Sequence, residues 1–218
     1  MLRILIADDH ELARKGIRSL LENRPGWDVC GEAKDGREAV ERAADLKPDI
    51  VLLDIGMPNL NGLEAARQIL SASPNIAILI LTMHDSDQTI REVLRAGARG
   101  FLLKSDAGTD LMEAVEALQT QRTYFNNRVS QMVLDGYLDR EVPDRRGSDT
   151  ANDVLTTRER EVIQLLAEGK TSKEVAVTLN LSVKTAETHR TNLMRKLGLH
   201  SVADLTRYAV RNGIVQVF

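Results

Sequence analysis

The chain has 218 residues, which allows one large domain or two small ones. Hydrophobic residues make up 43% of it and charged residues 28%, a balance typical of folded globular proteins rather than of disordered chains. The longest apolar run, residues 76–81, is far shorter than the ~20 residues of a membrane span, and acidic residues follow the N-terminus too closely for a secretory signal peptide. We therefore expect a cytoplasmic protein without membrane association. The single cysteine, Cys30, cannot form an internal disulfide and fits a reducing compartment.

The net charge of −3 conceals an asymmetry along the chain. Residues 1–153 carry 19 basic and 26 acidic side chains, whereas residues 154–218 carry 10 basic and 6 acidic ones. The first part therefore has a charge of −7 and the second a charge of +4. This difference predicts two domains with different partners, and the basic one is a candidate for contact with nucleic acid.

In the first part, short apolar runs alternate with segments whose apolar residues recur at helical spacing. The predicted strands lie at residues 4–7, around Val29, and at residues 50–53, 78–81 and 100–103. The predicted helices lie at residues 12–21, 39–43, 63–70, 90–94 and 111–118. Because the runs are apolar throughout, they predict a five-stranded parallel sheet covered by helices on both faces. In such a doubly wound sheet, functional residues gather at the carboxyl ends of the strands.

The second part contains no strand-like run and is predicted to be all-α, with apolar positions at residues 162–166, 175–179 and 193–197. The expected helix-end signals are a capping box at Thr156 or Thr157 with Glu159 or Glu161, a stop at Gly169, and a helix capped by Ser182 that runs to Gly198.

Between the two parts lies a polar, turn-rich stretch that ends in RRGSDTANDV. We place the first domain at residues 1–122, a linker at 123–153 and the second domain at 154–218. The linker is predicted to be partly helical, through Val129, Met132 and Val133.

Polar side chains follow four of the predicted strands: Asp8 and Asp9 the first, Asp54 the third, Thr82 the fourth and Lys104 the fifth. Taken singly, each has an ordinary explanation as a helix cap, a turn residue or a surface lysine. Together they would meet at one edge of the sheet, where three carboxylates repel one another unless a cation lies among them. Oxygen ligands of this kind suit Mg²⁺, which favours a phosphoryl partner. Lys104 and Thr82 could then contact phosphoryl oxygens.

Several other site classes lack their residue patterns. The loop ADDHELARKG has no glycine-rich turn, and the pattern GxxxxGK[ST] is absent from the sequence, which argues against dinucleotide and NTP binding. The four histidines have no metal-ligand spacing, so we expect polar surface residues rather than a zinc site. A metal-dependent phosphatase with a helical accessory domain remains an alternative, but such phosphatases carry their nucleophile in a D-x-D after the first strand. Here the isolated candidate nucleophile is Asp54.

The first part resembles the receiver domain of bacterial two-component response regulators, in the acidic pair Asp8 and Asp9, in Asp54 of DIGMP, in Thr82 of LTMHDSD and in Lys104 of GFLLK. The resemblance implies a flavodoxin-like fold and phosphoryl transfer from a sensor histidine kinase to Asp54. It also implies Mg²⁺ held by Asp8, Asp9, Asp54 and the Gly56 backbone carbonyl, with Thr82 and Phe101 as switch residues. One departure is Ser105, which follows Lys104 where many receivers have proline.

The second part contains a helix over residues 172–179, a short turn and a second helix from Val183, which is the spacing of a helix-turn-helix. We expect Val183, Ala186, Leu193 and Leu197 to face the core. From the residues alone, DNA binding and an ordinary solvated helix face are both open. The stretches LTTREREVIQLLAEGKTSKEVA and LSVKTAETHRTNLMRKLGL resemble the LuxR/NarL effector, which favours DNA. The candidate DNA contacts are then Lys184, Thr185, Glu187, Thr188, Arg190, Thr191, Asn192 and Arg195.

Together, these resemblances predict a transcription regulator in which phosphorylation of Asp54 favours a homodimer that binds double-stranded promoter DNA, with RNA polymerase as a further candidate partner. The last helix, around Val202, Leu205 and Tyr208, is the expected dimer contact in the effector domain. We expect no separate enzymatic turnover beyond slow autodephosphorylation. A regulator that works without phosphorylation is the other alternative, although the complete set of pocket residues argues against it.

Overall fold

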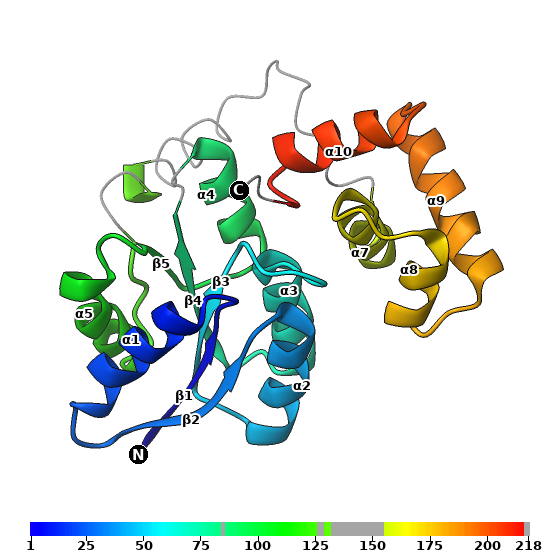
Figure 1. Cartoon of the computed structure of the whole chain (residues 1–218). Coiled ribbons are helices and arrows are strands. Elements are labelled where there is room, and N and C mark those ends of the chain that lie inside the picture. The colour runs from blue at the N-terminus through cyan, green and yellow to red at the C-terminus, as the bar shows by residue number, and fades with distance from the viewer. Residues whose placement is uncertain (84–85, 126–128, 132–154, 216–218) are drawn as a thin grey trace. The chain divides into compact units, whose positions relative to one another are not determined.

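Residues 1–83, 86–125, 129–131 and 155–215 are described by the computed structural model of the chain. Residues 129–131 are helical, while Met132, Val133 and the other linker residues from 132 to 153 lie outside the described ranges. None of the helices in these ranges has the length and hydrophobicity of a membrane-spanning segment. The chain divides into two units, one α/β and one helical (Figure 1).

The first unit is built on a parallel sheet with the strand order β2-β1-β3-β4-β5. Its strands are β1 (Leu2–Ala7), β2 (Trp27–Ala33), β3 (Ile50–Asp54), β4 (Ala77–Thr82) and β5 (Gly100–Leu103). The central strands β3 and β4 are buried along their whole length, because helices cover both faces of the sheet. The doubly wound parallel sheet predicted from the apolar runs is therefore confirmed.

The helices of the first unit are α1 (Glu11–Glu22), α2 (Gly36–Leu46), α3 (Gly62–Ala72), α4 (Asp87–Arg95) and α5 (Ala107–Gln119). Helices α1 and α5 lie on one face of the sheet, and α2 and α3 lie on the other (Figure 1). Helix α4 is joined to α3 by an ion pair between Arg67 Nη2 and Glu92 Oε2, 2.8 Å apart. The Glu92 side chain is largely buried, so this pair is shielded from solvent on the α4 side.

The chain returns to the sheet after α5. The Phe101 backbone N–H donates to the Tyr124 carbonyl at 2.9 Å, and the Tyr124 N–H donates to the Arg99 carbonyl at 3.0 Å. Tyr124 thus extends the hydrogen bonding of β5 two residues past the boundary that we predict at residue 122. These two hydrogen bonds hold the start of β5 on the edge that faces away from β4.

The second unit consists of α7 (Thr157–Ala167), α8 (Ser172–Thr178), α9 (Val183–Leu197) and α10 (Val202–Arg211) around one apolar cluster. Its all-α character is confirmed. Thr156 and Glu159 form the capping box at the start of α7, and the Ser182 side chain accepts from the Thr185 N–H at the start of α9. Helix α9 ends at Gly198, whose φ of 63° is left-handed.

Two polar contacts hold the helix-turn-helix onto α7. The Lys196 ammonium lies 2.8 Å from the Glu159 carboxylate, and Arg158 Nη2 donates to the Leu179 carbonyl at the end of α8 at 2.6 Å. Burial would raise the pKa of Glu159, but Lys196 and the Thr156 donors outweigh it and hold that pKa below its usual value. The carboxylate is therefore ionised at neutral pH and fixes the C-terminal half of α9.

Gly62, the first residue of α3, should not tolerate a side chain. A Cβ at this position would lie 1.9 Å from the Asp54 carbonyl oxygen. Gly62→Ala should therefore lower the free energy of unfolding of the first unit by about 1–3 kcal/mol. The measurement is urea unfolding of the full chain followed by the fluorescence of Trp27, which is the only tryptophan and lies in β2.

Gly16→Ala is the matched control, because Gly16 lies inside α1 and a Cβ added there would have open space around it to a distance of 4 Å. It should raise the stability by about 0.5–1 kcal/mol. Equal shifts in the two variants would contradict the close approach of α3 to the Asp54 backbone.

Candidate functional site

The register of the sheet gathers polar residues at the carboxyl ends of its strands. Asp54 and Thr82 are the last residues of β3 and β4, and Asp8 directly follows β1. Asp54 pairs with Leu81, and the Lys104 N–H donates to the Thr82 carbonyl at 2.8 Å, so Lys104 emerges from β5 at the same edge. Asp8, Asp54, Thr82 and Lys104 therefore share one end of the sheet.

A lysine lies between two buried carboxylates at this edge. Lys104 Nζ is 2.8 Å from Asp8 Oδ2 and 2.9 Å from Asp54 Oδ2, and the two aspartates are 1% and 4% exposed. Burial raises the pKa of Asp54 above its usual value, although the Lys104 ammonium acts in the opposite direction. Burial lowers the pKa of Lys104, but Asp54 and Asp8 outweigh it and raise that pKa overall. Lys104 is therefore a permanent cation, and it lies beside an Asp54 carboxylate whose ionised form is destabilised by burial.

Four side chains at this edge can offer ligand atoms to one metal ion. A carboxylate oxygen from each of Asp8, Asp9 and Asp54 and a ring nitrogen of His10 lie within 4.8 Å of one another. Three carboxylates fit a hard divalent cation such as Mg²⁺, which prefers oxygen ligands. The residues present therefore fit the ion that the acidic pattern predicts.

The sequence indicates an ordinary polar residue at His10, but the structure places this side chain in the acidic cluster. Its Nδ1 lies 2.7 Å from Asp9 Oδ1, and its backbone N–H donates to Asp8 Oδ1 at 2.8 Å. The only signal in the sequence is its adjacency to the acidic pair.

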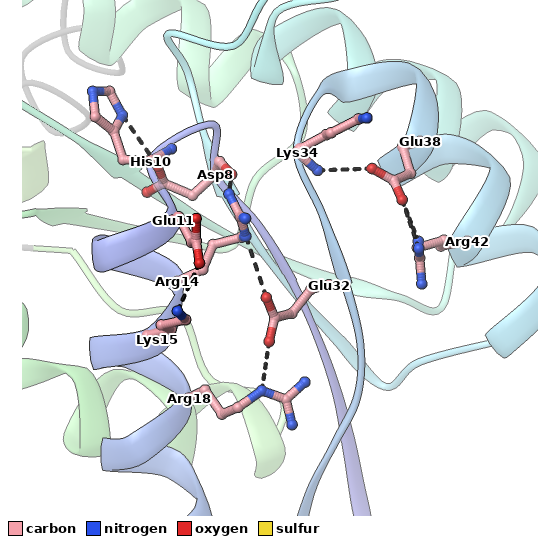
Figure 2. Close-up of polar contacts among 10 residues, drawn as sticks. All are labelled: Asp8, His10, Glu11, Arg14, Lys15, Arg18, Glu32, Lys34, Glu38 and Arg42. Carbon is pink, nitrogen blue, oxygen red and sulfur yellow. Dashed lines mark hydrogen bonds and ion pairs between the residues drawn. The ribbon is translucent and has the colours of Figure 1, made fainter.

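An arginine from α1 holds the backbone of the acidic loop (Figure 2). Arg14 Nη1 donates to the Asp8 carbonyl at 2.6 Å, and its Nε donates to Glu32 Oε2 at 3.2 Å. Arg18 donates to the other oxygen of Glu32 at 2.5 Å. These residues tie Asp8 to both α1 and β2, and the sequence gives no sign of them because Glu32 is distant from both arginines in the chain.

The loop after β3 also contacts the site. The Gly56 backbone lowers the Asp54 pKa, which partly offsets the effect of burial. The Gly62 N–H donates to the Ile55 carbonyl at 3.0 Å and closes this loop against α3. The role expected of the Gly56 carbonyl as a metal ligand remains a prediction.

The two residues expected to act as switches are both buried: Thr82 is 0% and Phe101 is 1% exposed. Phe101 pairs with Ile80 of β4, one strand closer to the centre of the sheet. The peptide bond between Lys104 and Ser105 is trans, as are all peptide bonds in the described ranges.

In the helical unit, α9 presents most of the candidate DNA contacts to solvent. Ala186 and Leu193 are buried against the core, whereas Arg190 and Asn192 are half-buried. The exposed candidates are Lys184, Thr185, Glu187, Thr188, Thr191 and Arg195.

The expectation that Val183 faces the core is wrong, because its side chain is 40% exposed. Val183 is the first residue of α9 and is rotated by about 60° from Ala186 around the helix, toward the exposed side. In α10, Leu205 is buried and Tyr208 half-buried, so Val202 is the large apolar side chain that this helix exposes.

Comparisons with known proteins agree with both units. Residues 4–116 match the family model "Response regulator receiver domain", and residues 153–209 match "Bacterial regulatory proteins, luxR family". The chain is 36% identical over 217 residues to the transcriptional regulatory protein LiaR of Bacillus subtilis (strain 168), covering 99% of this chain and 100% of LiaR. The chain is a response regulator of the LuxR family.

Two further relatives support this assignment. The oxygen regulatory protein NreC of Staphylococcus aureus (strain bovine RF122 / ET3-1) is 34% identical, over 99% of this regulator and 100% of NreC. The structure of RcsB from Salmonella enterica serovar Typhimurium, bound to promoter rprA in the presence of phosphomimetic BeF3-, is 30% identical with a TM-score of 0.58. It covers 95% of this regulator and 97% of RcsB. The regulator thus has a receiver domain and a LuxR-type DNA-binding domain, and its family is one of transcription regulators rather than conventional enzymes.

The charge on Asp54 should cost the receiver stability. Because its folded pKa lies above the unfolded value of about 3.9, stability is lost as the pH rises through the folded pKa. Asp54→Asn removes this cost and should raise the free energy of unfolding near pH 7, with a gain that shrinks as the pH approaches 4. The measurement is urea unfolding followed by Trp27 fluorescence.

Added Mg²⁺ provides the control. At pH 7 it should raise the free energy of unfolding of the native chain much more than that of the Asp54→Asn variant. A variant that is less stable than the native chain at neutral pH, or that gains equally from Mg²⁺, would contradict this account of the pocket.

Proposed function

We propose that this regulator binds promoter DNA under the control of phosphorylation at Asp54, with a sensor histidine kinase as the phosphoryl donor. The observation that carries the proposal is the contact of Lys104 with both buried aspartates at the strand ends, in one chain with a helix-turn-helix domain. The proposed boundaries are 1–122 for the receiver, 123–153 for the linker and 154–218 for the effector. The site of action would be the cytoplasm, where promoter DNA is found.

In the proposed reaction, an Asp54 carboxylate oxygen attacks the phosphorus of a phosphohistidine. The new O–P bond forms as the N–P bond breaks, and the imidazole leaves with the bonding electron pair. Lys104 lies 2.9 Å from Asp54, where its charge can neutralise phosphoryl oxygens, and in the proposal the Thr82 hydroxyl donates to another of these oxygens. Mg²⁺, held by Asp8, Asp9, Asp54 and the Gly56 carbonyl, would supply further neutralisation of charge.

Phosphorylation can control DNA binding only if it favours one of two receiver states. In our proposal, the phosphoryl group draws the Thr82 hydroxyl toward it, and the Phe101 side chain follows. The surface around α4 and α5 then changes and favours a second copy of the receiver. The free energy of the phosphoryl contacts is thereby converted into dimerisation.

A dimer suits the effector domain, because a single helix-turn-helix makes few contacts with DNA and operators usually present two half-sites. Lys184, Arg190 and Arg195 are the proposed phosphate contacts. Thr185, Glu187, Thr188, Thr191 and Asn192 are the proposed contacts to base edges. The RcsB structure, in which promoter DNA and a phosphomimetic are present together, supports the combination of the two functions. RNA polymerase would be a further partner at the promoter.

The proposal predicts that a small phosphodonor with Mg²⁺ adds one phosphoryl group to the full chain, as measured by intact mass spectrometry. Size-exclusion chromatography with light scattering should then show a shift from monomer to dimer. Asp54→Asn should lack both changes. Asp45→Asn is the control for loss of a carboxylate, because Asp45 lies on the exposed side of α2 and should behave as the native chain does.

Modification at another residue would contradict the role of Asp54. A dimer that forms equally in Asp54→Asn would favour a regulator that works without phosphorylation, and turnover of a phosphomonoester would favour the phosphatase.

A further inference from the structure

The exposed face of α9 combines two charged ends with a middle that carries methyl groups and one carboxylate. At 100° per residue, five of its exposed residues fall within an arc of about 100° around the helix, centred away from Ala186 and Leu193, while the exposed Val183, Thr185 and Lys196 lie outside this arc. The residues of this arc, which we call the reading face, are Lys184, Glu187, Thr188, Thr191 and Arg195.

The cations lie at the two ends of the reading face. Lys184 and Arg195 are eleven residues apart, which corresponds to about 16 Å along the helix axis. Their long side chains can contact phosphates that flank the groove, which leaves the shorter side chains of α9 opposite the base edges.

The hydroxyl hydrogens of the two threonines in the middle of the reading face are bonded to backbone carbonyls of α9. Thr188 Oγ1 donates to the Lys184 carbonyl at 2.8 Å, and Thr191 Oγ1 donates to the Glu187 carbonyl at 2.9 Å. Each hydroxyl has a single hydrogen, so neither threonine can donate to the acceptor atoms of guanine or adenine without losing its bond to the helix. The hydroxyl oxygen can still accept from an amino group, and the γ-methyl group is what each threonine can offer to a base edge that carries no donor.

Val183 adds a further apolar group beside the reading face. It lies four residues before Glu187, so the two side chains are neighbours on the helix surface. Val183 is 40% exposed and lies at the end of the helix that a helix-turn-helix directs toward base edges. An apolar partner in the groove would remove it from water.

Glu187 restricts which base can lie among these methyl groups. Its carboxylate is exposed and accepts hydrogen bonds only, so it is repelled by phosphates and by base edges that carry only acceptors. The amino group of cytosine is the major-groove donor that a glutamate characteristically contacts.

We propose that α9 recognises a half-site in which thymine methyl groups flank a cytosine, with Val183, Thr188 and Thr191 contacting the methyls and Glu187 accepting from the cytosine amino group. The proposal rests on the proposed function, since it requires that α9 enters the major groove. The thymine C5-methyl is the one apolar group that the major-groove edges of unmodified DNA present.

The test begins with the selection of bound duplexes from a random pool by the full chain treated with phosphodonor and Mg²⁺. Each thymine of the selected half-site is then replaced by deoxyuridine, which removes only the C5-methyl group. Affinity should fall about three- to tenfold at each thymine that faces Val183, Thr188 or Thr191.

Substitutions at Thr188 separate the methyl from the hydroxyl. Thr188→Val keeps a methyl and should retain both the affinity and the preference for thymine over uracil. Thr188→Ser keeps the hydroxyl and should lose that preference at one position. Thr206→Ser is the matched control, because Thr206 also donates to the carbonyl four residues earlier but lies in α10.

The outcomes distinguish the two proposals. Selected duplexes that bind equally well with uracil would overturn methyl recognition while leaving DNA binding intact. The same conclusion would follow if Thr188→Val bound as weakly as Thr188→Ala, which lacks both the hydroxyl and the γ-methyl group. If no duplex is enriched and binding shows no dependence on salt, the proposed function itself fails.

Discussion

The ammonium of Lys104 between the carboxylates of Asp8 and Asp54 is the interaction on which the receiver pocket depends. Two carboxylates that are almost fully buried would repel each other, and the Lys104 ammonium within 3 Å of both stabilises their charges. The pocket is still costly, because burial keeps the pKa of Asp54 above its usual value. A phosphoryl group or a divalent cation would therefore enter a site whose charges are not yet balanced.

The rest of the receiver supports this contact from several directions. The parallel register brings β1, β3, β4 and β5 to one edge, and the close approach of Gly62 to the Asp54 backbone sets the loop after β3. Arg14 and Glu32 hold the Asp8 backbone from the other side (Figure 2). Rigid support of this kind keeps the acidic groups close together despite their repulsion, which is what pre-organises a site for phosphoryl transfer.

Much of this could be predicted from the sequence, because the signals are local. Uniformly apolar runs identify buried parallel strands, and residues such as Ser182 and Gly198 mark helix ends through their own backbone preferences. What could not be predicted depends on contacts between distant residues or on the exact rotation of a helix. The clamp by Arg14 on Asp8 is one example, and the exposure of Val183, which was expected in the core, is another.

In the proposed mechanism, Asp54 in one domain controls the DNA affinity of the other. The most direct measurement is the affinity of the full chain for a selected operator duplex, by fluorescence anisotropy at fixed salt, with and without Mg²⁺ and beryllofluoride. The native chain should bind about 5- to 150-fold more tightly with the phosphoryl mimic, which is the range of typical allosteric couplings. Asp54→Asn should show no change. An equal gain in the variant, or no gain in a native chain that has bound beryllofluoride, would contradict the account.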